Sequence, residues 1–459
     1  MPKKSEKNKK EVFASPKGMR DIIGDEYYRY QGFFEKAQEI AVYYGFKPIE
    51  TPVLEKEGVF TGTIGEDSDI VEKEMYNLKT KGGDHLVLRP EATAPVMRAY
   101  IENGMQSWPQ PVMLYYSSTF YRHERPQRGR FREFRQFGLE ILGSPKSIAD
   151  AIIIQTTLAI LKEAGIKNPC VNINSLGDKE SRNAYLKELS SYFRKHINKL
   201  TPEQRQKLKQ NPLRLLDSKD LKLDELRAEA PDSISMLSPD SKKHFKEVLE
   251  YLESMGIEYK IDNTLVRGLD YYSKTVFEIT HSDDDVAEEP KKNVEDKEKE
   301  NKEKDGADTE EIKATPLSIA GGGRYDYLAK RLGSKKDVSG VGVGIGVDRI
   351  LMDENVRRLD PKVIKKPKIY FIQLGFDAKL KSLIVIEILR KAKVPIMQTL
   401  SKDSLIGQLS VAEKLSVPYT IIFGQKEALS DTVIIRKMDT RSQNTVKISE
   451  LAEYLKKLK

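Results

Sequence analysis

Arginines are concentrated in one stretch of this sequence, YSSTFYRHERPQRGRFREFRQFGLEILG (116–143). A β-prone run (112–120) leads into the stretch, and a second β-prone run (135–141) ends it. This pattern predicts two antiparallel strands joined by a long basic loop. Guanidinium groups hold phosphates through paired hydrogen bonds, so the loop favours a phosphate-bearing ligand. The arginines are Arg122, Arg125, Arg128, Arg130, Arg132 and Arg135.

Two polar side chains of the second strand are expected on one face. Because side chains alternate along a strand, Gln136 and Glu140 share a face with Gly138 between them, and the apolar residues at 137, 139 and 141 share the opposite face. The glycine would leave room for a small molecule. A polar pocket beside a basic loop suits a nucleotide together with a small polar substrate. A solvated basic hairpin without a ligand is the alternative.

A carboxylate and a hydroxyl follow a short predicted strand in the motif RPEAT (89–93). Glu91 and Thr93 would lie at a strand-to-helix turn, where they could capture an amino group. They could equally cap the helix, which is the commoner use of such residues.

A second polar cluster lies in LVRGLDYY (265–272), which contains Arg267, Tyr271 and Tyr272. Buried tyrosines need partners for their hydroxyl groups, so the pair could form pocket walls. Ordinary core packing remains open from this stretch alone.

Glycines recur in AGGGRYDYL (320–328) and in SGVGVGIGVDRI (339–350). Three consecutive glycines allow backbone to approach a ligand closely, although they could form a mere turn. Alternate glycines leave one face of a strand bare, so a flat ring could lie by Gly344 with Arg349 near its phosphates. The spacing does not fit the dinucleotide fingerprint GxGxxG, which excludes a Rossmann interpretation.

These residues need a framework of strands and helices. Apolar spacing predicts a helix at 26–44, and two prolines confine the following strand to an edge, where core packing and contact with a second subunit are equally open. The expected elements are a strand (46–54), a Gly- and Asp-rich loop (61–69), strands (74–78, 85–89), a helix (96–102), a helix (148–165), a strand (170–174), a lysine-rich helical insertion (179–256) and a β-prone run (259–279).

A different pattern begins at Pro367. Alternating strands and helices predict a separate small domain with a mixed sheet. Its expected strands are 369–374, 394–397, 419–423 and 431–437, and its expected helices are 378–392, 405–415 and 448–458.

Composition narrows the class of protein. The 459 residues contain one cysteine, which excludes a disulfide framework or a cysteine-rich zinc site and fits a reducing compartment. The net charge is +8, but residues 283–313 hold 14 acids and 7 bases, so the rest of the chain carries about +15. That balance favours a polyanionic partner such as nucleic acid. No apolar run approaches the ~20 residues needed to span a bilayer.

The predicted organisation is an α+β catalytic domain with an antiparallel sheet and a helical insertion, followed by a C-terminal α/β domain. The expected bounds are a disordered basic arm (1–16), the catalytic domain (17–355), a linker (356–366) and the C-terminal domain (367–459). An acidic loop (282–314) has no aromatic residue, so we expect it to be disordered and to carry no catalytic group.

Together the arginine hairpin, RPEAT, LVRGLDYY, AGGGRYDYL and GIGVDR resemble the histidyl-tRNA synthetase family of class II synthetases. The resemblance implies histidyl-adenylate formation from L-histidine and ATP with Mg²⁺, then transfer to tRNA(His), in a cytoplasmic homodimer without a tightly bound cofactor or protein-held metal. It also implies that the C-terminal domain binds the anticodon and that the 26–54 segment is the dimer motif.

The resemblance also assigns roles to residues. The α-amino group of histidine would contact Glu91, Thr93 and Gln136, and the imidazole would contact Glu140 and Tyr272, with Tyr271 beside them. The ATP phosphates would contact the catalytic residues Arg122, Arg267 and Arg349, with adenine near Gly344. The acceptor end of tRNA would contact Arg125 and Gln127.

Three positions depart from the family pattern. Ala92 and Tyr327 stand where glycine is common, and Asp348 replaces the usual glutamate beside Arg349. If position 92 needed a positive φ, alanine would cost roughly 1 kcal/mol.

Three rival functions fit part of this pattern. The non-catalytic regulatory paralogue of histidine biosynthesis usually lacks the C-terminal domain, which is present here. A class II synthetase for proline or glycine fits Glu140, Tyr271 and Tyr272 poorly. A generic nucleic-acid-binding module would explain the charge but not the pocket pattern.

Overall fold

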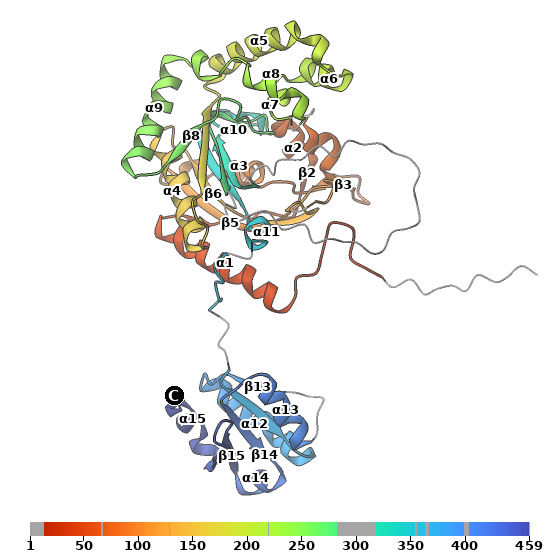
Figure 1. The fold of residues 1–459 in the computed structure, drawn as a ribbon, viewed down its shortest axis with the longest axis vertical. Helices are drawn as coiled ribbons and strands as arrows, with labels where there is room; N and C mark the ends of the chain where they lie inside the picture. The colour runs from red at the N-terminus through yellow and green to blue at the C-terminus, as the bar shows by residue number, and fades with distance from the viewer. Residues whose placement is uncertain are drawn as a thin grey trace, which may run out of the picture. The chain divides into compact units, whose positions relative to one another are not determined.

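The computed structural model describes residues 13–65, 68–127, 129–218, 220–281, 317–353, 356–362, 367–398 and 404–458. The chain divides after Pro361 into two compact units, each with its own sheet (Figure 1). This confirms the expected antiparallel α+β unit followed by a smaller βα unit. Within the described residues, no helix has the length and apolar character needed to cross a membrane.

An eight-stranded sheet forms the framework of the larger unit. Neighbouring strands are antiparallel except at the two edges, where β1 pairs with β5 and β7 with β8 in parallel. In spatial order the strands are β1 (Lys47–Pro48), β5 (Val112–Tyr121), β6 (Glu133–Leu142), β11 (Gly340–Gly346), β10 (Leu317–Arg324), β9 (Ser273–His281), β7 (Cys170–Ser175) and β8 (Tyr259–Ile261).

Strand alternation gives this sheet one apolar face and one mixed face. The apolar side chains of β6, predicted at 137, 139 and 141, are buried in a core that they share with residues of three helices. Those helices also bury Phe33 and Ile153, so one continuous core covers that face. They are α1 (Gly24–Tyr43), α4 (Ile148–Glu163) and α9 (Pro239–Ser254).

The mixed face is bordered by shorter elements. A three-stranded sheet packs there with α2 and α3, in a second core that includes Phe60 and Val87. The elements are β2 (Leu54–Lys56), β3 (Tyr76–Lys79), β4 (His85–Leu88), α2 (Glu57–Ile64), the π-helix η1 (Ile70–Glu74), α3 (Thr93–Glu102), η2 (Met105–Ser107) and α10 (Leu328–Arg331). The short helix α11 (Val347–Leu351) instead buries Val347 and Ile350 in the core of the apolar face.

Two local predictions were wrong in this region. The expected loop at 61–69 is helical up to Ile64, because burial of Phe60 and Ile64 outweighs the low helix propensity of two glycines. The expected strand at 46–54 is two short strands in different sheets, β1 and β2, separated at Pro52. Proline cannot donate to a strand ladder, which accounts for the break.

The helical segment predicted at 179–256 divides between the two faces. Helices α5 to α8 bury Tyr185, Leu189 and Leu216 in the core of the mixed face, whereas α9 buries Phe245 in the opposite core. The capping box predicted at Thr201 and Gln204 is present. The elements are α5 (Lys179–Lys195), η3 (Ile197–Lys199), α6 (Pro202–Gln210), α7 (Leu213–Leu216), η4 (Leu221–Leu223), α8 (Asp224–Ala228) and η5 (Ile234–Met236).

The smaller unit contains a five-stranded mixed sheet, with each predicted element present and two further elements added. The short helix α14 and the edge strand β16 were not predicted, since each is only five or six residues long. The strands in spatial order are β13 (Ile396–Gln398), β12 (Ile369–Gln373), β14 (Tyr419–Phe423), β15 (Thr432–Lys437) and β16 (Gln443–Lys447), and the helices are α12 (Phe376–Lys391), α13 (Leu405–Lys414), α14 (Gln425–Ser430) and α15 (Ile448–Lys457).

Several expectations fall outside the described residues. These are the basic arm up to residue 12, the acidic loop at 282–314 and residues 363–366 of the linker.

Candidate functional site

Glycines of neighbouring strands lie side by side on the mixed face of the large sheet, and we call this row, with the side chains that lie over and around it, the trough. In one row that crosses β5, β6, β11, β10 and β9, Tyr116 pairs with Gly138, Gly138 with Gly344, Gly344 with Gly321, and Gly321 with Glu278. Three adjacent glycines therefore form the floor of this row. The sequence predicted that alternate glycines leave one face of a single strand without side chains. In the structure this glycine row continues across β6, β11 and β10.

Part of this bare face is filled by the protein itself. A Cβ atom on Gly138 would lie 2.0 Å from Cζ of Tyr116, and one on Gly342 would lie 1.6 Å from Oε2 of Glu140. The space that we predicted beside Gly138 for a small molecule is therefore occupied by the Tyr116 ring. Glycine is needed at both positions because side chains from neighbouring strands cross over the backbone.

One end of the trough is acidic and phenolic. Glu140 is fully buried and accepts hydrogen bonds from the hydroxyl groups of Thr93, over 2.9 Å, and Tyr325. Burial raises the pKa of Glu140 to about 8. No lysine or arginine of the described chain forms an ion pair with this carboxyl group, so burial keeps it mostly protonated at neutral pH unless a cationic ligand pairs with it.

Glu91 is the second buried carboxylate at this end. It accepts hydrogen bonds from the backbone N–H groups of Thr93, over 2.7 Å, and Ala94, over 2.9 Å, so the capping alternative is present in the structure. The hydroxyl of Tyr271 lies 3.3 Å from the same carboxylate. Burial raises the pKa of Glu91. Ala92 has φ −108°, so the departure from glycine at this position carries no backbone strain.

Three tyrosine rings surround the two carboxylates. The ring of Tyr271 lies 4.7 Å from that of Tyr272 and 5.9 Å from that of Tyr325, centroid to centroid. All three rings are buried. Tyr272 packs against the position of a Cβ on Gly323, and the partner of Glu140 is Tyr325 rather than Tyr272.

The other end of the trough is basic. The guanidinium of Arg267 lies over Gly321, with NH1 2.5 Å from the position a Cβ would take, and donates to Glu278 over 3.2 Å. Burial alone would lower the pKa of Arg267, but Tyr272 and Glu278 raise it overall. This arginine therefore carries its charge on the glycine floor itself.

Arg122 and Arg349 lie close enough to influence one another, and Arg122 also lies beside the turn that carries Glu91. Arg122 donates to the carbonyl of Pro90 over 2.9 Å, and Arg349 donates to the carbonyls of Gly129, over 3.0 Å, and Ser318, over 2.6 Å. Burial and the neighbouring Arg130 lower the pKa of Arg349. Hydrogen bonds to backbone carbonyls thus stabilise these guanidinium groups, whose positive charges would otherwise repel one another.

Asp348 connects three elements beside the arginine-rich loop. It is buried and accepts hydrogen bonds from the hydroxyl of Tyr30, over 2.7 Å, and from the backbone N–H of Arg135. An aspartate at the family's glutamate position therefore joins α1, β6 and α11.

The remaining predicted residues are Gln136, Arg125 and Gln127. Gln136 faces Gly344, with Nε2 3.3 Å from the position of a Cβ there. Arg125 and Gln127 are exposed at the loop tip and do not contact the trough. The structure therefore brings together the residues predicted for the small substrate and for phosphates, and leaves the two loop-tip residues outside.

Sequence reasoning missed several residues that shape the trough. Tyr325 follows the triple glycine, and a tyrosine directly after a glycine strand was an available signal. Tyr116 and Glu278 lie in β-prone runs without any distinguishing pattern.

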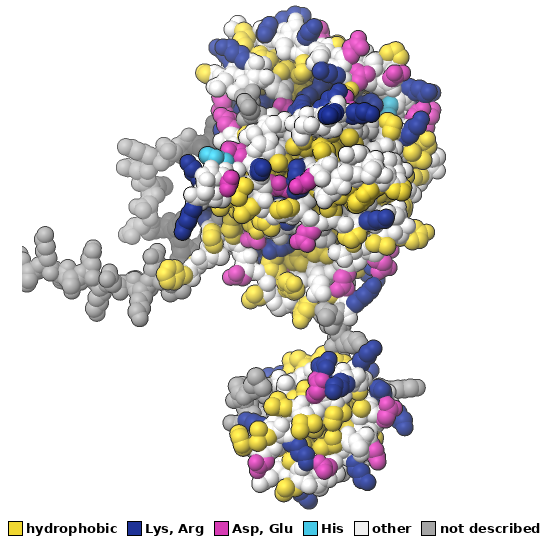
Figure 2. All heavy atoms as spheres, turned by 180° about the vertical axis from the view of Figure 1, so that it is seen from behind, with side chains coloured by type: hydrophobic (Ala, Val, Ile, Leu, Met, Phe, Trp, Pro, Cys, Tyr) yellow, Lys and Arg dark blue, Asp and Glu magenta, His cyan; other side chains and the backbone are white. Residues whose placement is uncertain are grey.

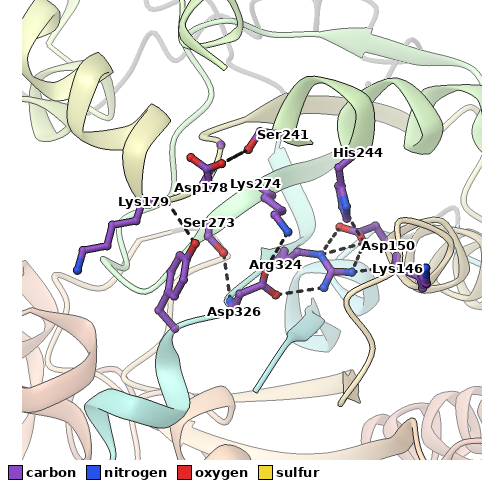
Figure 3. A network of polar contacts seen from close by, with 12 residues as sticks. Lys146, Asp150, Asp178, Lys179, Ser241, His244, Ser273, Lys274, Arg324 and Asp326 are labelled. Carbon is purple, nitrogen blue, oxygen red and sulfur yellow. Dashed lines mark hydrogen bonds and ion pairs between the residues drawn. The ribbon is translucent and has the colours of Figure 1, made fainter. Parts of the chain in front are cut away.

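A buried ionic network behind the trough was also missed (Figure 3). Arg324 is fully buried and donates to Asp150 over 3.1 Å and to Asp326 over 3.2 Å. Lys274 lies 3.1 Å from Asp326, and His244 lies 3.4 Å from Asp150. Burial would raise the pKa of Asp150, but Arg324 and His244 hold it well below its usual range. The network joins β10 to α4 and α9 and so fixes the strand whose glycines floor the trough.

Comparison with known proteins gives consistent matches. A family model described as histidyl-tRNA synthetase matches residues 18–287, and an anticodon binding domain model matches residues 368–458. A histidine--tRNA ligase of Dehalococcoides mccartyi is 34% identical over 97% of this chain and 100% of its own length. One of Fervidobacterium nodosum is 37% identical over 94% and 95%.

A solved structure is similar over the same extent. The apo histidyl-tRNA synthetase of S. aureus is 26% identical to this chain, with a TM-score of 0.73 that covers 97% of this chain and 100% of that one.

Proposed function

Because this chain belongs to the histidyl-tRNA synthetase family and ligates histidine to tRNA(His), we propose that the trough is the site where histidine is activated by ATP. In the first step a carboxylate oxygen of histidine attacks the α-phosphorus of ATP, which gives histidyl-adenylate and releases pyrophosphate. In the second step a hydroxyl of the terminal ribose of tRNA(His) attacks the carbonyl carbon of the adenylate, which forms the histidyl ester and releases AMP.

The observation that carries this assignment is the opposite polarity of the two ends of one trough. Glu91 and Glu140 lie with three tyrosines at one end, and Arg267 lies over the glycine floor at the other. A substrate that is cationic at one end and joins a polyphosphate at the other suits this arrangement. Histidine with ATP has that distribution of charge.

The acidic end would bind histidine. Glu91, Thr93 and Gln136 would hold the α-amino group, and Glu140 and Tyr272, with Tyr271 beside them, would contact the imidazole. A carboxylate and a phenol can engage both ring nitrogens, which gives a physical reason for selecting histidine. The contact between Glu140 and Tyr325 supports adding Tyr325 as the group that orients this carboxylate.

The basic end would bind ATP. Arg122, Arg267 and Arg349 would contact the phosphates, and the adenine would lie near Gly344, where the strand has no side chain. Arg267 would neutralise the charge that develops on the α-phosphate in the transition state, since fixed charge at the reacting centre is a strong contribution to such reactions.

Magnesium would enter with ATP as a ligand of its phosphates. Hard cations prefer oxygen ligands, and Glu278, beside Arg267 in the trough, is an oxygen donor that fits this chemistry. The ion would neutralise phosphate charge. No tightly bound cofactor enters this proposal.

The tRNA would meet exposed basic surface outside the trough. Figure 2 shows lysine and arginine side chains over the part of the larger unit where Figure 1 places α5 to α8. We assign the acceptor end to Arg125 and Gln127 at the exposed loop tip, and the anticodon to the 367–459 unit.

The assembly would be a cytoplasmic homodimer. Its contact surface would include α1 and the segment that follows it, where β1 is an edge strand and the apolar side chains of Tyr43 and Val53 are exposed. Exposed apolar groups beside a sheet edge suit association with a second copy. The regulatory paralogue considered from the sequence is not favoured, because the full-length relatives are histidine--tRNA ligases and the C-terminal unit is present.

The test is ATP–pyrophosphate exchange with each amino acid supplied separately. Exchange that depends on histidine alone supports the assignment of the acidic end. Exchange with another amino acid would keep the fold and discard the proposed roles of Glu140 and Tyr272. Exchange with none of them, in folded protein, would contradict the activation step.

A further inference from the structure

The turn between β8 and β9 presents Arg267 to the trough, and its first half is fixed by the sheet. The side-chain amide of Asn174, on β7, donates to the carbonyl of Leu265 over 3.0 Å. Within the turn, Asp262 accepts from the backbone N–H of Thr264 over 2.9 Å. These contacts precede Arg267 in the chain, so a separate set of contacts must fix the backbone that follows it.

Asp270 is the residue where the second half of the turn is held. Its backbone N–H donates to the carbonyl of Ile64, at the end of α2, over 3.1 Å. Its carbonyl accepts from Arg331, on α10, over 3.3 Å. The approach to α2 is close, because a Cβ on Gly65 would lie 2.4 Å from Oδ2 of Asp270. Both contacts come from elements of the larger unit that lie outside helices α5 to α8.

Further contacts with Asp270 come from the helical insert, which we define as helices α5 to α8 (179–228). Arg182, on α5, donates to the carbonyl of Asp270 over 3.0 Å, and its other terminal nitrogen lies 3.6 Å from Oδ1. The side-chain amide of Asn211, between α6 and α7, donates to the same Oδ1 over 2.9 Å. Two separate elements of the insert therefore hold one side chain of the turn.

The insert also lies against the residue directly after Arg267. Oδ2 of Asp217, which ends α7, is 3.4 Å from the position of a Cβ on Gly268. The charge of Asp217 contributes to raising the pKa of Arg267. The insert thus contacts the turn at both 268 and 270, on the side that follows the arginine.

The base of the insert is itself firmly anchored to the catalytic unit. Asp178 caps α5 by accepting from the backbone N–H of Ser181 over 2.9 Å, and it accepts from the hydroxyl of Ser241, on α9, over 2.9 Å (Figure 3). Burial would raise the pKa of Asp178, but these hydrogen bonds lower it to about 2. The insert is therefore fixed to α9 through Asp178 at its beginning, and it contacts the turn at Asp270.

We propose that Asp270 is a positioning residue, through which the helical insert holds the turn that presents Arg267. The insert then contributes to adenylate formation even without tRNA. This inference rests on the proposed role of Arg267 at the α-phosphate. A small displacement of a group that acts on the transition state lowers kcat, because such a group must be held within fractions of an ångström. Tyr271 and Tyr272 follow Asp270 directly, but they have contacts of their own with Glu91 and with the position of a Cβ on Gly323, so histidine binding should change less than kcat.

The test is histidine-dependent ATP–pyrophosphate exchange by the full-length chain without tRNA. Asn211→Ala and Arg182→Ala should each lower kcat about 10-fold, with the KM for histidine within about twofold of wild type. Arg182→Lys should recover part of the loss, since a lysine keeps the charge but not the paired geometry. The matched control is Arg205→Ala, because Arg205 is an exposed arginine of the insert that donates to Ile197 within the insert.

The same substitutions in an Arg267→Ala background separate positioning from general damage. If the insert acts through Arg267, Asn211→Ala should have no further effect on the residual exchange. An additional 10-fold loss there, or wild-type kcat for both Asn211→Ala and Arg182→Ala, would overturn the inference. Wild-type exchange by Arg267→Ala alone would instead overturn the proposed role of that arginine. Thermal unfolding of each variant shows whether a loss of exchange activity is caused by unfolding. If Arg182→Ala is unfolded, the activity of Asn211→Ala, the smaller change, decides the test.

Discussion

The hydroxyl group of Thr93 donates a hydrogen bond of 2.9 Å to the carboxyl group of Glu140, although the two residues lie 47 positions apart on different elements. Together with the bond from Tyr325, this contact occupies one lone pair on each carboxylate oxygen. Lone pairs remain for a ligand, and among the described residues no lysine or arginine forms an ion pair with this carboxyl group. A cationic imidazole or ammonium group would therefore supply the positive charge that favours the ionised form of this oriented group.

Replacing Glu140 by glutamine should change how stability depends on pH. The pKa of Glu140 is raised from 4.5 to about 8, so its contribution to stability is fully present below pH 4.5 and is lost as the pH rises through about 8. We expect Glu140→Gln to unfold at a higher temperature than wild type at pH 9, by ~3 °C or more, and at the same temperature at pH 5. Thermal unfolding by circular dichroism at several pH values checks this.

The exposed Glu39→Gln variant is the control, and its profile should follow wild type at every pH. Parallel profiles for Glu140→Gln and wild type would contradict a buried carboxyl group with a raised pKa.

The same substitution should weaken histidine binding selectively. Glutamine preserves the shape of Glu140 and a hydrogen-bond acceptor but removes the charge that an imidazole contact would use. We expect the KM for histidine in pyrophosphate exchange to rise about 100-fold, with the KM for ATP unchanged within about twofold. An equal rise in both KM values would indicate a general disturbance of the trough instead.

Adding one methyl group to the floor of the trough should disrupt it. In Gly342→Ala the new Cβ would lie 1.6 Å from Oε2 of Glu140, so the carboxyl group must move away from Thr93 and Tyr325. We expect a loss of about 1–3 kcal/mol in the free energy of unfolding and a large loss of histidine-dependent exchange. Denaturant unfolding and exchange assays measure the two effects.

Gly58→Ala provides the comparison, since nothing lies within 4 Å of a Cβ at that position. It should retain wild-type stability or gain slightly, as alanine favours a helix. If Gly342→Ala were as active and as stable as this control, the close packing of Glu140 over β11 would be contradicted.

Truncation after residue 364 should separate the two steps of the reaction. The trough lies wholly within the unit that ends at Pro361, so exchange should remain within about threefold of the full chain. Charging of tRNA(His) should fall by at least about 100-fold in kcat/KM, because the anticodon contacts would be lost. Undiminished charging would remove the anticodon assignment of the 367–459 unit.

Features set by local periodicity could be predicted from the sequence. Gln136 and Glu140 lie on the same face of β6 because side chains alternate along a strand. The helix α4 follows from the spacing of its apolar residues. The helix α2 could not be predicted this way, because Gly58 and Gly62 disfavour a helix that only tertiary burial of Phe60 and Ile64 stabilises.

The interior of the candidate site depended on contacts between distant segments. Tyr325 reaches Glu140 from 185 positions away, and Arg182 reaches Asp270 from 88 positions away. No periodicity in one segment reports which residue of another segment will face it. The filled space beside Gly138 illustrates the same limit, since the ring that occupies it belongs to the neighbouring strand.

The most direct test of the account is single-turnover formation of histidyl-adenylate by Arg267→Ala, with histidine affinity measured separately. Arg267 lies on the glycine floor and contacts Glu278, away from Glu140. We predict a loss of at least about 100-fold in the rate of adenylate formation, with the Kd for histidine within about threefold of wild type. A wild-type rate in a folded variant would contradict the claim that the basic end of the trough acts on the α-phosphate.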